Sequence, residues 1–196
     1  MGCKMITIII PAYYANKELA DMTERCVDSI GEFDGELILQ VDENGDGYSV
    51  TTNKALRAAQ GDILVIGNND LIFHENWLTG LLFPLNVGFD IATCWTSDQA
   101  NIEIEDKIES EAKFGSLLAM NRRVYDVLGG FDEQFTGYFT DTDYRRRALN
   151  TGFKIGKNRN MVVEHLAKAT YKITDPDDTE FLRAQRLFEA KHGFAE

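Results

Sequence analysis

The chain has 196 residues, is 44% hydrophobic and carries a formal net charge of −12. This length suits one domain, and the apolar content is sufficient for a hydrophobic core. The negative charge argues against nucleic acid and against anionic membranes as partners, because both bind clustered Lys and Arg. We expect a single domain over residues 1–196, with a nucleotide-binding half at about 1–96 and an acceptor-side half at about 97–196.

Export and membrane signals are not evident in the sequence. No apolar run reaches the ~20 residues of a membrane helix, and the run before Pro11 is too short for a signal peptide. Cys3, Cys26 and Cys94 are widely separated and odd in number. We therefore expect reduced packing cysteines in a cytoplasmic protein that has no membrane segment.

Strands and helices alternate in the first half of the chain. Apolar runs predict strands, and apolar residues at helical spacing predict helices, in the order strand 5–10, helix 18–30, strand 37–41, helix 49–60 and strand 63–66. Such alternation is typical of parallel βαβ units that are covered on both faces. The expected fold class is therefore α/β, a single domain with a doubly wound mixed sheet and helices on both faces.

The second half is less regular. A strand is expected at 91–94, and the polar, acidic segment 97–113 has no sustained periodicity. Long irregular segments are commonly functional, so we expect a lid that orders over donor or acceptor. The later pattern predicts an ordered segment, two helices, a strand and an amphipathic helix, at 114–120, 122–128, 141–150, 161–163 and 178–192.

Acidic and amide side chains follow two of the predicted strands. Residues 42–47 open like a calcium-binding loop, but Val50 and Asn53 stand where two of its ligands belong. We prefer a role for Asp42 in accepting hydrogen bonds from a base or ribose, beside the alternative of a Gly-rich turn. Asp70 suits a divalent cation that bridges two phosphates, and Asn69 a sugar, with a polar turn as the alternative.

Further candidates lie near the last predicted helices. Asp141 and Asp143 fit a helix cap and its first turn, or a general base at the edge of a cleft. Asp143 and Arg146, three residues apart, suit an ion pair. His165 is either structural or a metal ligand, and His74 and His192 are expected to face solvent.

Several of these segments, in their order, resemble GT-A-fold glycosyltransferases of family 2, an inverting group that includes rhamnosyl- and glucosyltransferases. The resemblance covers roughly residues 5–170. It rests on the opening strand with Pro11-Ala12-Tyr13, on Asn53-Lys54-Ala55-Leu56, on Asn68-Asn69-Asp70, on 129–135 and on Asp141-Thr142-Asp143-Tyr144 with Arg146. Thr140 stands where that family commonly has Glu.

The resemblance implies a role for each group of residues. Donor-nucleotide contacts would come from Pro11, Ala12, Tyr13, Asp42, Asn53 and Asn69. Asp70, with His165, would bind Mn²⁺ or Mg²⁺, and Asp141 would be the catalytic base. Asp143 and Arg146 would lie on the acceptor side and orient the site.

The expected function is metal-dependent, inverting transfer of a sugar from a UDP- or dTDP-sugar to a glycan or other hydroxyl acceptor. A homo-oligomer is compatible with the sequence. One alternative is a sugar nucleotidyltransferase, which should have a Gly-rich phosphate loop after the first strand, whereas residues 12–17 contain no glycine. The other is a non-catalytic module that binds a nucleotide or a glycan without turnover.

Overall fold

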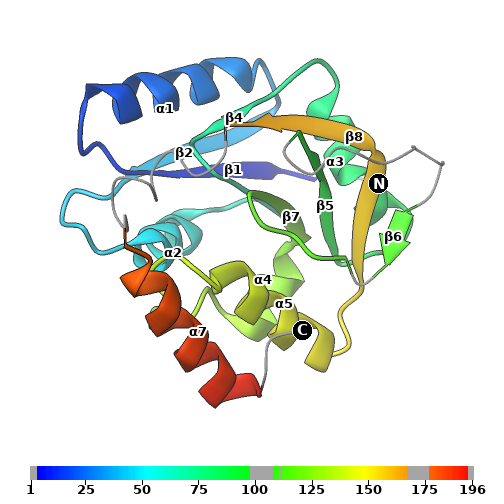
Figure 1. Cartoon of the computed structure of the whole chain (residues 1–196). Helices are drawn as coiled ribbons and strands as arrows, with labels where there is room; N and C mark the ends of the chain where they lie inside the picture. Colours follow the sequence, from blue (N-terminus) through cyan, green and yellow to red (C-terminus); the bar gives the residue numbers. More distant parts are fainter. Residues whose placement is uncertain (1–3, 98–107, 111, 167–176, 194–196) are drawn as a thin grey trace.

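The computed structural model describes residues 4–97, 108–110, 112–166 and 177–193 (Figure 1). The elements in chain order are β1 (Ile6–Ala12), α1 (Lys17–Ser29), β2 (Gly35–Val41), α2 (Tyr48–Ala58), β3 (Ile63–Gly67), β4 (Leu71–Ile72), α3 (Trp77–Asn86), β5 (Ile91–Thr96), β6 (Ile108–Ser110), β7 (Leu117–Asn121), α4 (Arg122–Leu128), α5 (Thr140–Asn150), β8 (Ile155–His165) and α7 (Thr179–His192). Each helix and strand expected in the first half is present, with ends that differ by a few residues.

One mixed sheet organises the molecule. Its strand order is β2-β1-β3-β7-β5-β8-β4, and β6 pairs with β8 off this path. β1 is parallel to β2 and to β3, whereas β7 runs antiparallel to β3 and to β5. The carboxyl ends of β1, β2 and β3 therefore meet at one edge, next to the start of β7. Ligands of open α/β sheets bind beyond this kind of edge.

Helices cover both faces of the sheet, as the alternating side chains of β1 require. Ile8 and Ile10 belong to a buried cluster with Cys26 near the end of α1 and Trp77 of α3. Ile9 points to the opposite face and belongs to the cluster of α2, α4 and α5. Figure 1 shows α1 on one side of the sheet and α2, α4 and α5 on the other. The predicted doubly wound α/β fold is confirmed.

Three strands depart from the prediction. The two-residue strand β4 was not predicted, and β8 is far longer than the predicted 161–163 because it continues through the polar residues 157–160. In the predicted lid 97–113, residues 98–107 and 111 lie outside the described residues. Residues 108–110 of that segment form β6, which pairs with β8. This part of the segment is therefore a regular strand, contrary to the prediction.

The helix α7 packs away from the sheet. Its Ala184 and Phe188 form a third buried cluster with Phe135 of the loop between α4 and α5. In Figure 1 this helix, coloured orange to red, lies on the same side of the sheet as α2 and α5. The amphipathic pattern predicted for 178–192 is therefore confirmed, and its apolar face covers a loop.

Two further expectations concern cysteines and membranes. Cys26 and Cys94 are buried free thiols, and burial raises the pKa of each to about 12, so both remain protonated at neutral pH. They are packing residues, as predicted. Within the described ranges, no helix combines the length and the hydrophobicity that crossing a membrane requires.

Candidate active site

The ends of β1 and β2 form one wall of the candidate site. The backbone N–H of Asp42 donates to the carbonyl of Ala12 at 2.7 Å, which holds the two strand ends together. The Asp42 carboxylate then accepts from the backbone N–H groups of Asp46 and Gly47, each at 2.9 Å. Asp42 therefore folds the turn into α2. Because each carboxylate oxygen can accept more than one hydrogen bond, contact with a nucleoside stays a prediction.

Pro11, Ala12 and Tyr13 lie at the same edge. Pro11 and Ala12 are buried and Tyr13 is half-buried. The register of β1 pairs Ala12 with Val41, directly before Asp42, and Ile9 with Ile66 of β3. The four residues predicted to contact the nucleoside, Pro11, Ala12, Tyr13 and Asp42, are thus close together, beside the end of β3.

The segment Asn68–Asp70 follows β3 directly. The backbone N–H of Asn68 donates to the carbonyl of Ser116 at 2.8 Å. Asn69 is buried, and its Nδ2 donates to Thr23 Oγ1 of α1 at 2.8 Å. The structure thus directs the Asn69 side chain toward α1, which gives this predicted sugar contact a role in anchoring the turn.

Asp70 and His165 meet although 95 positions separate them in the chain. The strand pairing of β4 with β8 places Leu71 opposite His165, and the N–H of Leu166 donates to the Asp70 carbonyl at 3.0 Å. As a result, His165 Nε2 lies 3.2 Å from Asp70 Oδ1, and both side chains are largely buried. Asp70 Oδ1 has no hydrogen-bond partner among the described residues. A buried, unsatisfied carboxylate oxygen of this kind needs an explanation such as an ion.

These two side chains fit a divalent cation. A carboxylate oxygen and an imidazole nitrogen are accepted ligands of Mn²⁺, and Mg²⁺ is commonly held by one or two carboxylates together with substrate phosphates. Over the described ranges, no group of three or more His, Cys, Asp and Glu side chains converges on one point.

Asp141 lies in the first turn of α5, beside the same edge. The helix begins at Thr140 after Phe139, so Asp141 is not the cap residue that the sequence suggested. Its Oδ2 lies 3.6 Å from the point where a side chain on Gly115 would begin. Gly115 directly precedes Ser116, whose carbonyl accepts from the N–H of Asn68. Because Asp141 lies beside Gly115, it is near the Asn68–Asp70 segment.

The protonation of Asp141 is shifted by its surroundings. Burial raises the pKa of its carboxyl above the ordinary value, although backbone N–H groups of the helix start act in the opposite direction. A raised pKa makes a carboxylate a better proton acceptor near neutral pH. Asp141 is therefore suited to the work of a general base.

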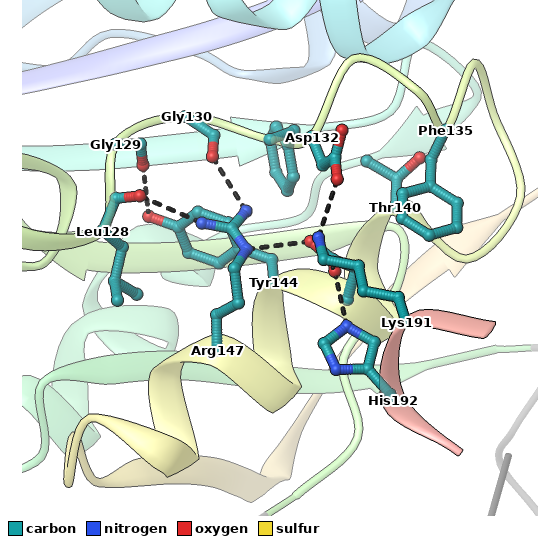
Figure 2. Close-up of polar contacts among 12 residues, drawn as sticks. Leu128, Gly129, Gly130, Asp132, Phe135, Thr140, Tyr144, Arg147, Lys191 and His192 are labelled. Carbon is teal, nitrogen blue, oxygen red and sulfur yellow. Dashed lines mark hydrogen bonds and ion pairs between the residues drawn. The ribbon is translucent and has the colours of Figure 1, made fainter. Parts of the chain in front are cut away.

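Asp143 has a different environment, since its side chain is completely buried and contacts Arg147, Lys191 and His192, whose side chains converge in Figure 2. It accepts from Arg147 Nε at 2.8 Å, from Lys191 Nζ at 2.6 Å and from His192 Nε2 at 2.7 Å. Burial acts to raise the pKa of Asp143, but these hydrogen bonds outweigh it and lower that pKa below its ordinary value. Asp143 is thus ionised at neutral pH and joins α5 to the end of α7.

Two predictions about this region are wrong. Asp143 pairs with Arg147, which is four residues away, instead of Arg146. That spacing also places Arg147 within reach of the carbonyls of Leu128 and Gly130, at 3.0 and 2.8 Å. His192 does not face solvent, because its side chain is only 10% exposed and contacts Asp143. His74 is exposed, as expected.

Asn53, a predicted nucleotide contact, serves the loop between α4 and α5. Its Nδ2 donates to the Phe131 carbonyl at 2.9 Å and to Glu133 Oε1 at 3.0 Å, and its Oδ1 accepts from the Phe131 N–H at 2.8 Å. A side chain on Gly130 would begin 2.1 Å from Asn53 Oδ1. The amide is committed to this loop, and we do not assign it to the nucleotide.

The sequence interpretation missed four residues of this region, namely Gly115, Arg147, Lys191 and His192. The spacing of Arg147 from Asp143, i to i+4, was a usable signal. Lys191 and His192 had none, because 48 and 49 positions separate them from Asp143.

The family model for glycosyl transferase family 2 matches residues 20–166, which span most of the sheet and include Asp70, Asp141 and His165. The chain belongs to glycosyl transferase family 2. The match confirms the resemblance inferred from the ordered motifs. No curated protein sequence matches the chain.

Solved structures of three other proteins share the fold. A mannosyltransferase from Pyrobaculum calidifontis, in complex with GDP-Man and Mn²⁺, is 17% identical with a TM-score of 0.64, over 93% of this chain and 64% of its own. Glucosyl-3-phosphoglycerate synthase from Mycobacterium tuberculosis, in complex with Mn²⁺, UDP and phosphoglyceric acid, is 16% identical with a TM-score of 0.67, over 98% and 80%. S. aureus TarS 1-349 is 12% identical with a TM-score of 0.65, over 95% and 65%. The chain therefore spans under two thirds of the mannosyltransferase and of TarS 1-349.

Proposed function

We propose that this family 2 chain is a metal-dependent glycosyltransferase that moves a sugar from a nucleoside diphosphate donor to an acceptor hydroxyl with inversion. The observation that carries the proposal is the approach of Asp70 Oδ1 to His165 Nε2 at 3.2 Å, at the carboxyl edge of the sheet. A cation bound there would offset the negative charge that develops on the departing diphosphate. The similar structures that hold Mn²⁺ with UDP or GDP-Man support this assignment.

The residues of the chain divide the remaining work. Pro11, Ala12, Tyr13 and Asp42 at the ends of β1 and β2 would bind the nucleoside of a UDP- or dTDP-sugar. Asp141 would accept the proton of the acceptor hydroxyl as the hydroxyl oxygen forms a bond to the anomeric carbon. The bond from that carbon to the diphosphate oxygen breaks in the same step, which inverts the configuration. One base suffices for this single displacement.

The chain's own charges explain why a cation would be needed. The net charge of −12 disfavours a diphosphate unless positive charge is supplied locally. The turn after β1, residues 13–16, contains no Lys or Arg, and Lys17, the first residue of α1, pairs with Asp21 at 2.6 Å. By holding a cation, Asp70 and His165 would make the donor site specific for a nucleoside diphosphate that is bound to a metal.

Thermal unfolding with UDP, dTDP and GDP, each with Mn²⁺ or with a chelator, tests the donor site. A ligand that binds only the folded state adds RT ln(1 + [L]/Kd) to the free energy of unfolding and so raises the melting temperature. At least one nucleotide should stabilise the chain with Mn²⁺ and lose that effect with chelator. Equal stabilisation under both conditions would contradict the metal role.

A further inference from the structure

The helix α7 lies outside the family match of 20–166, yet it contacts the residues that lead into α5. The residues 131–139 between α4 and α5 are called the α5-leading loop below. Arg183 Nη2 donates to the Gln134 carbonyl in this loop at 2.9 Å, and Thr136 Oγ1 donates to Glu180. The first half of α7 therefore holds the loop by polar contacts.

Aromatic contacts reach the last residue of the same loop. Phe139 has a left-handed backbone, with φ 62° and ψ 3°, and no side chain caps the helix that follows. This conformation is unfavourable for a bulky residue and persists only where its surroundings hold it. The Phe139 ring lies 5.7 Å from the Phe181 ring and 5.3 Å from the Phe188 ring of α7. The helix thus supports a strained residue two positions before Asp141.

The other end of α7 reaches the residue two positions after Asp141. Lys191 Nζ donates to Asp143 at 2.6 Å and to Asp132 at 2.7 Å, so one ammonium joins α5 to its leading loop (Figure 2). His192 Nε2 lies 2.7 Å from the same Asp143 oxygen. Because Asp143 is completely buried, its contacts fix the direction of the first turn of α5.

We propose that Lys191 and His192 are positioning residues that hold Asp141 in place beside Gly115. This proposal rests on the proposed function, in which Asp141 is the base. Contacts of α7 on both sides of Asp141, at Phe139 and at Asp143, leave the carboxylate little freedom to turn away from the site. A displacement of ~1 Å at a catalytic group can reduce turnover by about 100-fold.

The test uses Lys191→Met and His192→Phe in the full chain. Lys191→Met keeps the length of the side chain and removes its charge, and His192→Phe keeps a ring but no donor. Lys191→Arg keeps a cation at position 191, and Arg186→Met removes an exposed cation of the same helix for which the described residues show no ion pair. Asp143 is left intact, because its loss would leave Arg147 and Lys191 without their shared carboxylate.

The first measurement is the pKa of the Asp141 carboxyl by ¹³C NMR, without ligand. In Lys191→Met and His192→Phe that pKa should fall toward the ordinary value, since a loosened first turn admits water, and amide exchange of residues 140–143 should accelerate. Lys191→Arg and Arg186→Met should both leave the pKa of Asp141 at its wild-type value. An unchanged pKa with unchanged exchange in both variants would overturn the proposal.

The second measurement is release of UDP from UDP-glucose in the presence of Mn²⁺. The two variants should lower kcat by about 10- to 100-fold with an unchanged donor KM, because the donor site lies on β1 to β3. Wild-type kcat in both variants would overturn the proposal. If the wild-type chain binds no nucleotide and releases no UDP, the proposed function is overturned. In that case the NMR result by itself still shows whether Lys191 and His192 hold Asp141 in place.

Discussion

Replacement of Asp141 by Asn is expected to reduce sugar transfer by about 10²- to 10⁴-fold, the usual contribution of a positioned general base. The amide has the shape of the carboxylate but does not accept a proton. Stability should change little, because Asp141 is not the cap residue of α5 and the side-chain donor that the described residues offer it, Thr142 Oγ1, lies 3.4 Å away. Donor affinity, measured by calorimetry, should be that of the wild type.

The pH dependence of kcat gives a second readout of the same prediction. Asp141 must be ionised to act, and burial raises its pKa, so kcat should fall with decreasing pH at values above the ordinary Asp range near 4. This acidic limb should be missing from the residual activity of Asp141→Asn. Asp126→Asn, an exposed change on α4, is the matched control. Near-normal transfer by Asp141→Asn would remove the base from the mechanism, and the completely buried Asp143 is not placed to replace it.

Replacement of Asp70 by Ala should weaken binding of a nucleoside diphosphate by at least about 100-fold when Mn²⁺ is present. Loss of a partner that only orients a metal ligand already costs about 10- to 100-fold in metal affinity, and Asp70 would be a direct ligand. The fold should remain intact, since the change removes the contact with His165 and no hydrogen bond of Asp70 Oδ1 within the described residues, and the backbone contact to Leu166 is kept.

Calorimetric titration of the variant with UDP and Mn²⁺ checks this loss, and circular dichroism checks the fold. Asp126→Ala is the matched control, because it removes an exposed carboxylate that lies on α4. Asp70→Ala in chelator should bind no more weakly than the wild type in chelator. Wild-type affinity of Asp70→Ala in Mn²⁺ would assign Asp70 to the turn after β3 and not to the metal.

The core of the fold was predictable because its signals are local. The runs that form β1, β2 and β3 are short and apolar, and the spacing of Leu19, Met22 and Cys26 is helical. β4 has only two residues, which is too few for any periodicity. The first half of β8 includes Lys157 and Asn158, whose polarity hides a strand that pairs with β5 and β6.

Site residues at strand ends were also predictable, whereas their partners were not. Asp42 and Asp70 follow apolar runs, so the sheet rule placed them at one edge. The approach of His165 to Asp70 depends on the pairing of β4 with β8, and no local pattern reports that pairing. The amide of Asn53 looked available for a ligand, but Phe131 occupies it. Contacts between segments that are distant in the sequence determine which polar side chains remain available to bind a ligand.

The most direct test of the proposed activity is nucleoside diphosphate release from a panel of UDP-, dTDP- and GDP-sugars, followed by mass spectrometry with Mn²⁺ and with chelator. Water can serve as a slow acceptor, so the assay does not need the natural one. We predict release from at least one donor with Mn²⁺, abolished by chelator and reduced by Asp141→Asn. Binding of a nucleotide sugar without any release would contradict the proposed activity and identify a non-catalytic binding module.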